Sequence, residues 1–175
     1  MSVTTITGPM FADKTTTLIK LIRGTVGDVT VIRPSTDTRY SSERIVSHSG
    51  DYFSASGCDP DKLLEFAETV SGHVFIDEGH FFPDIVEAVQ LMIQNGCNSV
   101  TVAGIDFDYR KRPFANMQGV IAIAKNRIIC RAVCQCGEFA SYTKMREEFV
   151  VSPGIIVGGS EKYAPYCGSA ECEVW

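Results

Sequence analysis

Gly8-Pro9-Met10-Phe11-Ala12-Asp13-Lys14-Thr15-Thr16 is the stretch of sequence that decides the fold. A β-branched run, residues 3–7, precedes it, and apolar residues follow at helical spacing as Leu18, Ile19, Leu21 and Ile22. Strand, glycine-led turn and helix thus come in the order of a phosphate-binding loop, whose pattern is G-x-x-x-x-G-K-[ST]. The stretch therefore predicts that phosphate is bound at the start of a helix from Lys14 to Arg23.

Asp13 occupies the place of the second glycine in that pattern. Backbone N–H groups in this part of such a loop point at phosphate oxygens. A carboxylate about 6 Å from one phosphate charge, at an effective dielectric constant of about 20, costs roughly 3 kcal/mol, or on the order of a hundredfold in affinity. The sequence therefore predicts a loop whose binding of nucleotide is weakened by Asp13.

Length and composition predict one substantial core with a small appended module. The chain has 175 residues, of which 45% are hydrophobic and 21% charged. A net charge of −5 and the lack of a basic run argue against nucleic-acid binding. No apolar run approaches the roughly 18 residues of a membrane span, and the first residues do not resemble a signal peptide. We expect a soluble cytoplasmic protein that does not bind membranes.

The chain alternates segments typical of strands and helices. Such alternation predicts an α/β fold with an open parallel sheet. Gly24 and Gly27 end the first helix, and Asp59 and Pro60 begin a later one as cap and first helical residue. The further predicted elements are a strand at 28–32, helices at 59–70, 83–96 and 114–125, and strands at 73–76, 99–103 and 127–133.

Polar residues follow several of the predicted strands. The strand at 73–76 ends in Asp77-Glu78, a pair that phosphate-loop enzymes place beside magnesium; an acidic loop end is the alternative. Asp37 and Arg39 lie just beyond the strand at 28–32, where open α/β sheets place ligand contacts, although a solvated loop explains them equally well. We expect no chemical role for His48 or His73.

The loop at 106–114 interleaves aromatic and charged residues. Placed after a strand, such a loop can bracket a planar ring and a phosphate group together. A solvated connection with anchoring aromatic residues is the alternative interpretation.

Four of the seven cysteines lie near the C-terminus, as Cys134, Cys136, Cys167 and Cys172. Two cysteine pairs about thirty residues apart are typical of a structural zinc site that replaces a small core. The spacing departs from the usual one, because one residue separates the first pair and four separate the second. Two alternatives to a zinc site therefore stay open, namely that the four thiols are unligated or that they are oxidisable. We predict a nucleotide-binding domain at 1–133 and a zinc-ribbon module at 134–175.

A series of motifs, in the same order along nearly the whole chain, resembles thymidine kinases of the type shared by animals, bacteria and large DNA viruses, poxviruses among them. The resemblance is specific because few other protein families contain both of its two main motifs. These motifs are Gly8-Pro9-Met10-Phe11 and Asp77-Glu78-Gly79-His80-Phe81-Phe82-Pro83-Asp84. The remaining motifs are Asp37-Thr38-Arg39-Tyr40, Arg112-Pro113-Phe114, Ala140-Ser141-Tyr142-Thr143-Lys144 and Val157-Gly158-Gly159-Ser160-Glu161-Lys162-Tyr163.

The resemblance implies a RecA-like α/β domain followed by a zinc-held lasso that covers the nucleoside. The implied activity is transfer of the ATP γ-phosphoryl group to the 5′-hydroxyl of thymidine. The implied partners are ATP with Mg²⁺, thymidine, and a further copy of the chain in a homotetramer or dimer, with feedback binding of dTTP as an additional expectation. A catalytically impaired homologue that binds nucleoside or serves a structural or regulatory role is the alternative.

The resemblance also implies roles for individual residues. Glu78 matches the catalytic carboxylate, which accepts the proton of the 5′-hydroxyl. Thr15, Asp77 and Asp37 match magnesium-side positions, and the phosphate side comprises Gly8, Pro9, Met10, Phe11, Ala12, Asp13, Lys14, Thr15 and Arg39. The thymidine side comprises Met10, Phe81, Tyr109, Phe114, Thr143, Gly154, Ile155, Ile156, Val157, Gly158 and Tyr163. The four late cysteines match the metal ligands, with spacings one residue shorter and two residues longer than the family pattern.

Overall fold

A computed structural model describes residues 2–37, 43–149, 158–169 and 172. Arg39 and the segment 154–157, which the resemblance places at the site, lie outside these ranges. No helix of the described part of the chain is long and apolar enough to cross a membrane.

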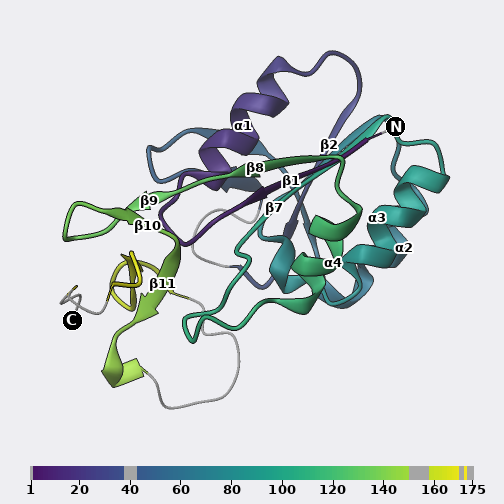
Figure 1. Cartoon of the computed structure of the whole chain (residues 1–175). Coiled ribbons are helices and arrows are strands. Elements are labelled where there is room, and N and C mark those ends of the chain that lie inside the picture. Colours follow the sequence, from purple (N-terminus) through teal and green to yellow (C-terminus); the bar gives the residue numbers. More distant parts are fainter. Residues whose placement is uncertain (1, 38–42, 150–157, 170–171, 173–175) are drawn as a thin grey trace.

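A six-stranded parallel sheet forms the centre of the molecule (Figure 1). Its strands alternate with helices along the chain, which confirms the predicted α/β class. The parallel pairing brings the carboxyl ends of the strands to one edge of the sheet. In the order β5-β2-β6-β7-β1-β8, the strands are β5 (Ser56–Cys58), β2 (Val29–Pro34), β6 (His73–Ile76), β7 (Ser99–Gly104), β1 (Ser2–Thr7) and β8 (Asn126–Ile129).

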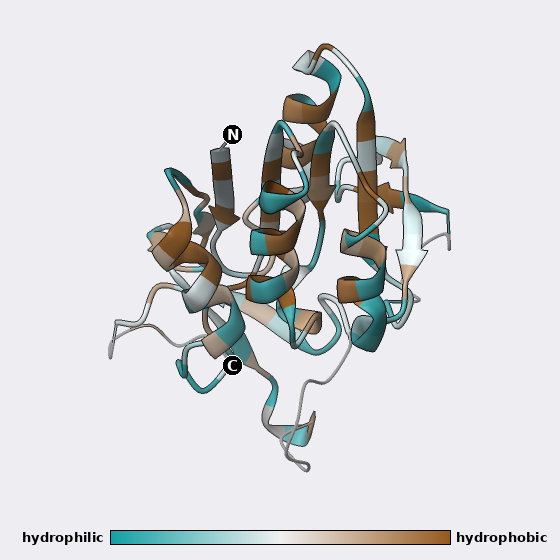
Figure 2. Cartoon of the chain, turned by 90° about the vertical axis from the view of Figure 1, so that its right-hand side faces the viewer, coloured by the Kyte–Doolittle hydropathy of each residue, from teal (hydrophilic) through white to brown (hydrophobic). Residues whose placement is uncertain are grey.

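Helices cover both faces of this sheet. Helix α1 (Lys14–Gly24) packs on one face, where Leu18, Ile19 and Ile22 meet the apolar residues of β1, β2, β6 and β7. Helices α2 (Leu63–Ala67), α3 (Ile85–Gln94) and α4 (Ala115–Ile123) pack on the other face in a second buried cluster. The helices carry brown and teal bands in Figure 2, as expected when one side is buried and the other exposed.

Several predicted elements differ from the observed ones in extent, two of them helices that begin or end elsewhere than expected. The helix expected at 59–70 is a 3-10 turn, η1 (Pro60–Lys62), followed by the short α2, although the side chain of Asp59 does cap the turn by accepting from the backbone N–H of Asp61 at 3.2 Å. The helix expected from Pro83 begins at Ile85. Propensity and capping locate such helices, but tertiary packing sets their ends.

The strand predicted at 127–133 is divided in two. Its first half, β8, pairs with β1, and the backbone N–H of Cys130 donates to Thr7 O at 2.7 Å as the last contact with that strand. Its second half, β9 (Ala132–Val133), pairs instead with β10 (Phe139–Ala140). Burial of Ala132 against Ala12 and Ala140, away from the main sheet, accounts for the break.

The C-terminal part consists of short antiparallel ribbons. Strand β11 (Tyr142–Met145) pairs with β12 (Tyr163–Tyr166), and the 3-10 turn η3 (Glu147–Phe149) follows β11. A small cluster of alanines and Cys134 joins these ribbons to the phosphate loop through Ala12. A domain boundary after residue 133 stays a prediction. The remaining elements are the hairpin β3 (Arg44–Val46) and β4 (Tyr52–Ser54), and the 3-10 turn η2 (Gly79–Phe81).

Candidate active site

The predicted phosphate loop connects the carboxyl end of β1 to the first residue of α1. Gly8 begins it with a φ of 144°, and a Cβ atom there would collide with the carbonyl oxygen of Cys130. Only glycine combines this conformation with such a close approach. Phe11 and Asp13 are also left-handed, at φ 64° and 54°, so the loop curls tightly before the helix begins.

Asp13 is accommodated in the loop by its backbone preference. Aspartate is one of the few non-glycine residues that adopt the left-handed region readily. Its side chain is exposed, and Oδ1 accepts a hydrogen bond from the Thr16 hydroxyl at 3.3 Å. The carboxylate therefore lies at the start of α1, where solvent and a helix N-terminus both favour a negative charge.

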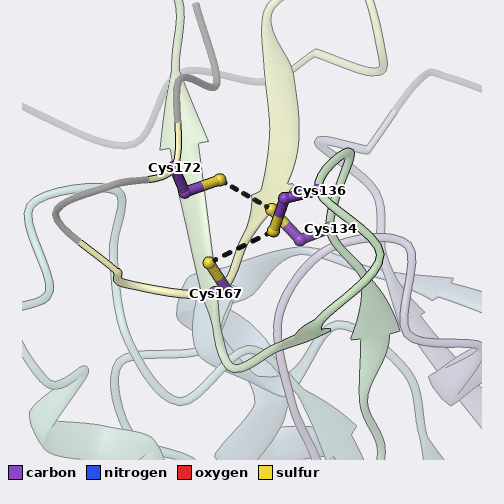
Figure 3. A group of neighbouring side chains, drawn as sticks. All are labelled: Cys134, Cys136, Cys167 and Cys172. Atoms are coloured by element: carbon purple, nitrogen blue, oxygen red, sulfur yellow. Dashed lines mark hydrogen bonds between the residues drawn. The ribbon is translucent and has the colours of Figure 1, made fainter.

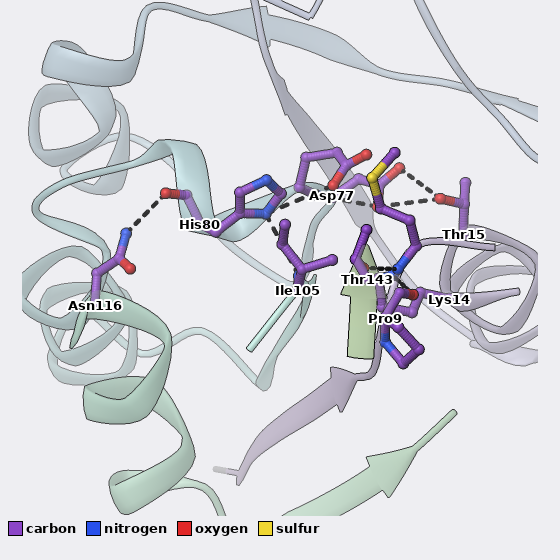
Figure 4. Close-up of polar contacts among 10 residues, drawn as sticks. Pro9, Lys14, Thr15, Asp77, His80, Ile105, Asn116 and Thr143 are labelled. Atoms are coloured by element: carbon purple, nitrogen blue, oxygen red, sulfur yellow. Dashed lines mark hydrogen bonds and ion pairs between the residues drawn. The ribbon is translucent and has the colours of Figure 1, made fainter. Parts of the chain in front are cut away.

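Lys14 reaches across the loop that it follows. Its ammonium group donates to the carbonyl oxygen of Pro9 at 2.6 Å (Figure 4). Burial lowers the pKa of Lys14, and the charges of Glu78 and Asp77 act in the opposite direction. The lysine thus has anionic partners across the site as well as a neutral contact within the loop.

Thr15 and Asp77 meet where β1 and β6 end. The Thr15 hydroxyl donates to the Asp77 carboxylate, at 3.1 Å to Oδ2 and 3.4 Å to Oδ1 (Figure 4). Burial, followed by the neighbouring Glu78 carboxylate, raises the pKa of Asp77 to about 7. The hydrogen bonds from Thr15 and from the Glu78 N–H, and the charge of Lys14, lower this pKa in part. Two adjacent carboxylates and a hydroxyl form an oxygen-rich site that a divalent cation would stabilise, so the donor set fits Mg²⁺.

Glu78 adopts a left-handed conformation, with φ at 51°, immediately after the strand that carries Asp77. Such backbone strain in a non-glycine residue is concentrated at functional sites. The Glu78 side chain is 19% exposed, and its Oε2 lies 3.6 Å from Nδ1 of His80. The turn therefore directs a partly buried carboxylate into the space between the phosphate loop and η2.

These residues line one cavity of about 260 Å³. The cavity brings together most of the predicted site residues from the phosphate, magnesium and thymidine sides. Gly8 and Pro9 form the base of the loop but do not line the cavity, and Arg39 and 154–157 are not described. The predicted residues that line it are Met10, Phe11, Ala12, Asp13, Lys14, Thr15, Asp37, Asp77, Glu78, Phe81, Tyr109, Phe114, Thr143, Gly158 and Tyr163.

The cavity has further lining residues that sequence reasoning missed. The ring of His48, a residue for which no role was expected, lies beside that of Phe11 with centroids 5.2 Å apart and planes tilted by 36°, and Arg44 lies on the same hairpin. No local pattern marks this hairpin as part of the site. His80 also lines the cavity, and its position two residues after Glu78 was the available signal.

The C-terminal ribbons close one side of the cavity. The backbone N–H of Met10 donates to the hydroxyl of Thr143 on β11 at 3.0 Å. Thr143 and Tyr163, which belong to paired strands, are both buried. The described residues of the ribbons therefore contact the phosphate loop directly.

The four late cysteines form one cluster (Figure 3). Sγ of Cys134 lies 3.3 Å from that of Cys172, Sγ of Cys136 lies 3.7 Å from that of Cys167, and all four sulfurs lie within 4.8 Å of one another. Zinc bonds of about 2.3 Å in a tetrahedron separate sulfurs by about 3.8 Å, so the cluster fits Zn²⁺. The unusual spacing in sequence does not prevent this arrangement, because the pairs come from two separate loops.

Comparisons with known proteins agree with this geometry. A family model described as thymidine kinase matches residues 1–170. Among curated proteins, the thymidine kinase of Coprothermobacter proteolyticus is 37% identical over 172 residues, a match that covers 93% of this chain and 86% of that protein.

Proposed function

The chain belongs to the thymidine kinase family, and from this premise we propose how its residues transfer phosphate from ATP to thymidine. The family activity is ATP-dependent phosphorylation of thymidine, with ATP and thymidine as substrates. Phosphoryl transfer requires mainly positioning and charge stabilisation. The roles below follow from that requirement.

The phosphate loop and Lys14 bind the ATP phosphates. The left-handed residues in the loop turn its backbone around the start of α1, where N–H groups and the helix dipole favour anions. Lys14 is partly buried beside these groups and close enough to Asp77 and Glu78 for their charges to act on it. Its ammonium group exchanges the Pro9 carbonyl for phosphate oxygen when nucleotide binds.

Thr15, Asp77 and Asp37 hold Mg²⁺ with the phosphates. Asp37 is 7% exposed and lines the same cavity as the other two residues. Mg²⁺ held there would neutralise charge that develops on the phosphates during transfer. Arg39 completes the phosphate side in this proposal.

Glu78 accepts the proton of the thymidine 5′-hydroxyl as its oxygen attacks the γ-phosphorus. A general base must come within about 2.6–3.2 Å of the hydroxyl that it deprotonates. Glu78 lies between Lys14 on the phosphate side and the aromatic residues on the other, which is where the two substrates must meet.

Phe81, Tyr109 and Phe114 enclose the thymine ring and sugar, together with Met10, Thr143, Gly158 and Tyr163. Aromatic side chains bind a planar base by stacking and exclude water from the reacting groups. Residues 154–157 contribute backbone contacts to the base edge in this proposal.

One observation carries this assignment: the contact between Thr15 and Asp77, with Lys14 and Glu78 facing the same cavity as the aromatic residues. The alternative of a catalytically impaired homologue rests mainly on Asp13, beside the altered spacings of the two cysteine pairs. The side chain of Asp13 is exposed and accepts a hydrogen bond from Thr16. Its carboxylate therefore does not displace the four groups of the proposed site, which are Lys14, Thr15, Asp77 and Glu78.

The test is turnover of thymidine with Mg-ATP by the purified protein and by Glu78→Gln. We expect turnover by the unmutated protein, and a loss of at least a thousandfold in Glu78→Gln with thymidine still bound, because the change removes the base and keeps its shape. Glu87→Gln, the same change at an exposed position on α3, is the matched control. Thymidine binding without turnover in the unmutated protein would support the impaired homologue instead.

Further expectations from the family resemblance remain proposals. They are Zn²⁺ on the four late cysteines, a homotetramer or dimer, feedback binding of dTTP, and a cytoplasmic location. The cysteine geometry supports the first.

A further inference from the structure

Arg33 is a buried cation that lines the cavity and has no role in the mechanism above. It lies near the carboxyl end of β2 and is only 5% exposed, yet it forms part of the cavity wall. Arginine keeps its charge in proteins, and an arginine is almost never fully buried unless it is paired. A buried guanidinium beside a proposed nucleotide site therefore calls for a partner.

The contacts of Arg33 within the described part of the chain satisfy only part of its guanidinium. Nη2 donates to the backbone carbonyl of Asp37, which is a neutral acceptor. A guanidinium has five N–H donors and one full charge. Among the described residues, no ion pair joins Arg33 to a carboxylate. The charge of Arg33 and most of its donors are thus available to an anion in the cavity.

The contact with Asp37 also holds the guanidinium in place. Residues 34–37 form a tight turn after β2, in which the Asp37 N–H donates to the carbonyl oxygen of Pro34 at 3.3 Å. The Ser35 N–H donates to the carbonyl oxygen of Cys58 at 2.8 Å, which ties the turn to β5. Because Arg33 and Asp37 both line the cavity, the turn keeps the guanidinium at the cavity wall.

The sheet places Arg33 beside the acidic pair. Strand β2 is the neighbour of β6, and the N–H of Asp77 donates to the carbonyl oxygen of Ile32 at 2.9 Å. Arg33 therefore follows at the level of Asp77, on a strand about 4.8 Å away. Val31, two residues earlier, packs with α1, so Arg33 projects from the same face of the sheet as that helix.

This position favours the terminal phosphate of ATP over the inner ones. Lys14 and Thr15 begin α1, and the contact between Thr15 and Asp77 brings the start of that helix to the end of β6. Glu78 follows the same strand, and in the proposed mechanism it receives the hydroxyl that attacks the γ-phosphorus. The γ-phosphate must therefore lie beside the end of β6, and Arg33 is one strand further from β1.

We propose that Arg33 binds the γ-phosphate of ATP through the N–H groups that Asp37 leaves available. The proposal rests on the binding of ATP given under Proposed function. A planar guanidinium suits this role because its fork of donors matches the oxygens of a phosphate group. Arg33 would then let the site bind the triphosphate donor more tightly than the diphosphate product, which has no γ-phosphate.

The test measures the affinities for Mg-ATP and Mg-ADP by titration without thymidine, so that no transfer to a nucleoside takes place. Arg33→Gln removes the charge but keeps an amide donor for the Asp37 carbonyl. We expect it to weaken ATP at least tenfold and to leave the ADP and thymidine affinities within threefold. Arg33→Lys keeps a positive charge and should lose less ATP affinity. Should Arg33→Gln not fold, Arg33→Met, whose flexible apolar side chain fills gaps, replaces it.

The matched control is Arg127→Gln, the same change at an exposed position of β8 that does not line the cavity, and it should leave all three affinities unchanged. In Arg33→Gln, equal losses for ATP and ADP, a parallel loss for thymidine, or an unchanged ATP affinity would overturn the proposal. If the unmutated protein binds no ATP, the proposed function fails and this inference with it. ATP binding that Arg33→Gln leaves intact removes this inference alone, so the two failures are distinct.

Discussion

The backbone N–H of Met10, in the phosphate loop, donates a 3.0 Å hydrogen bond to the hydroxyl of Thr143, which lies 133 residues later in the sequence. The bond joins the loop after the first strand of the sheet to a ribbon of the C-terminal part. Both residues line the cavity, so this contact joins the phosphate loop to the ribbon that we propose covers the nucleoside.

The first prediction tests this bond. Thr143→Val keeps the shape of the side chain but leaves the Met10 N–H without its acceptor, which should cost about 1–3 kcal/mol in the free energy of unfolding and weaken thymidine binding severalfold. Thr143→Ser keeps the hydroxyl and should retain most of both. Denaturant unfolding and thymidine titration provide the measurements, and equal behaviour of the Val and Ser variants would show that the bond contributes nothing.

A second prediction concerns Asp13. Asp13→Asn removes the negative charge and keeps a residue that tolerates the left-handed backbone, whereas Asp13→Gly removes both the charge and the side chain. Because the carboxylate lies beside the phosphate site that we propose at the start of α1, we expect either change to tighten ATP binding by about tenfold and to leave thymidine affinity nearly unchanged.

The test of this prediction is to titrate ATP and thymidine against the unmutated protein, Asp13→Asn and Asp13→Gly. If ATP binds all three equally, then solvent and the Thr16 hydroxyl screen the Asp13 charge completely. A gain in Asp13→Gly alone would mean that the side chain obstructs the loop sterically.

The third prediction concerns the metal. The purified protein should contain about one zinc ion per chain, and Cys172→Ser should lose most of it, because removing one thiolate breaks a tetrahedral set. Chelation should loosen β11 and β12, measured by hydrogen exchange, before it affects the main sheet. Cys58→Ala, at a buried thiol outside the cluster, is the control and should retain the ion. Zinc-free protein with protected ribbons would contradict the assignment.

The last prediction concerns Lys111, in the loop that also carries Tyr109. Its ammonium nitrogen lies 4.9 Å from the ring centroid of Tyr142 and 5.1 Å from that of Tyr166, so it bridges this loop to both strands of the ribbon. Lys111→Asn suits the backbone φ of 61° but removes the cation, and should cost about 1 kcal/mol in the free energy of unfolding. Lys111→Arg keeps the charge and should cost less. Faster hydrogen exchange in β11 and β12 of the Asn variant alone would support the bridge.

Local patterns in the sequence were sufficient to predict the elements that form the proposed site. A β-branched run, a glycine-led turn and a helical apolar stripe predicted the phosphate loop, and an apolar strand that ends in Asp77-Glu78 predicted the acidic pair. These signals are local because side-chain periodicity and turn chemistry act over a few residues. Parallel pairing then brings the strand ends to one edge of the sheet, and Thr15 and Asp77 do meet there.

Contacts between distant segments decided the rest. The strand expected at 127–133 broke because Ala132 is buried against Ala12 and Ala140 rather than in the main sheet, and no property of residues 127–133 alone encodes that choice. The same holds for His48, which a hairpin brings beside Phe11, and for the cysteines, whose spacing argued against a tetrahedral set until the fold brought the two pairs together. The sequence by itself indicated which groups are suited to bind phosphate, magnesium and zinc, whereas the contacts of Thr15 with Asp77 and of Met10 with Thr143 join distant segments and were decided by the tertiary structure.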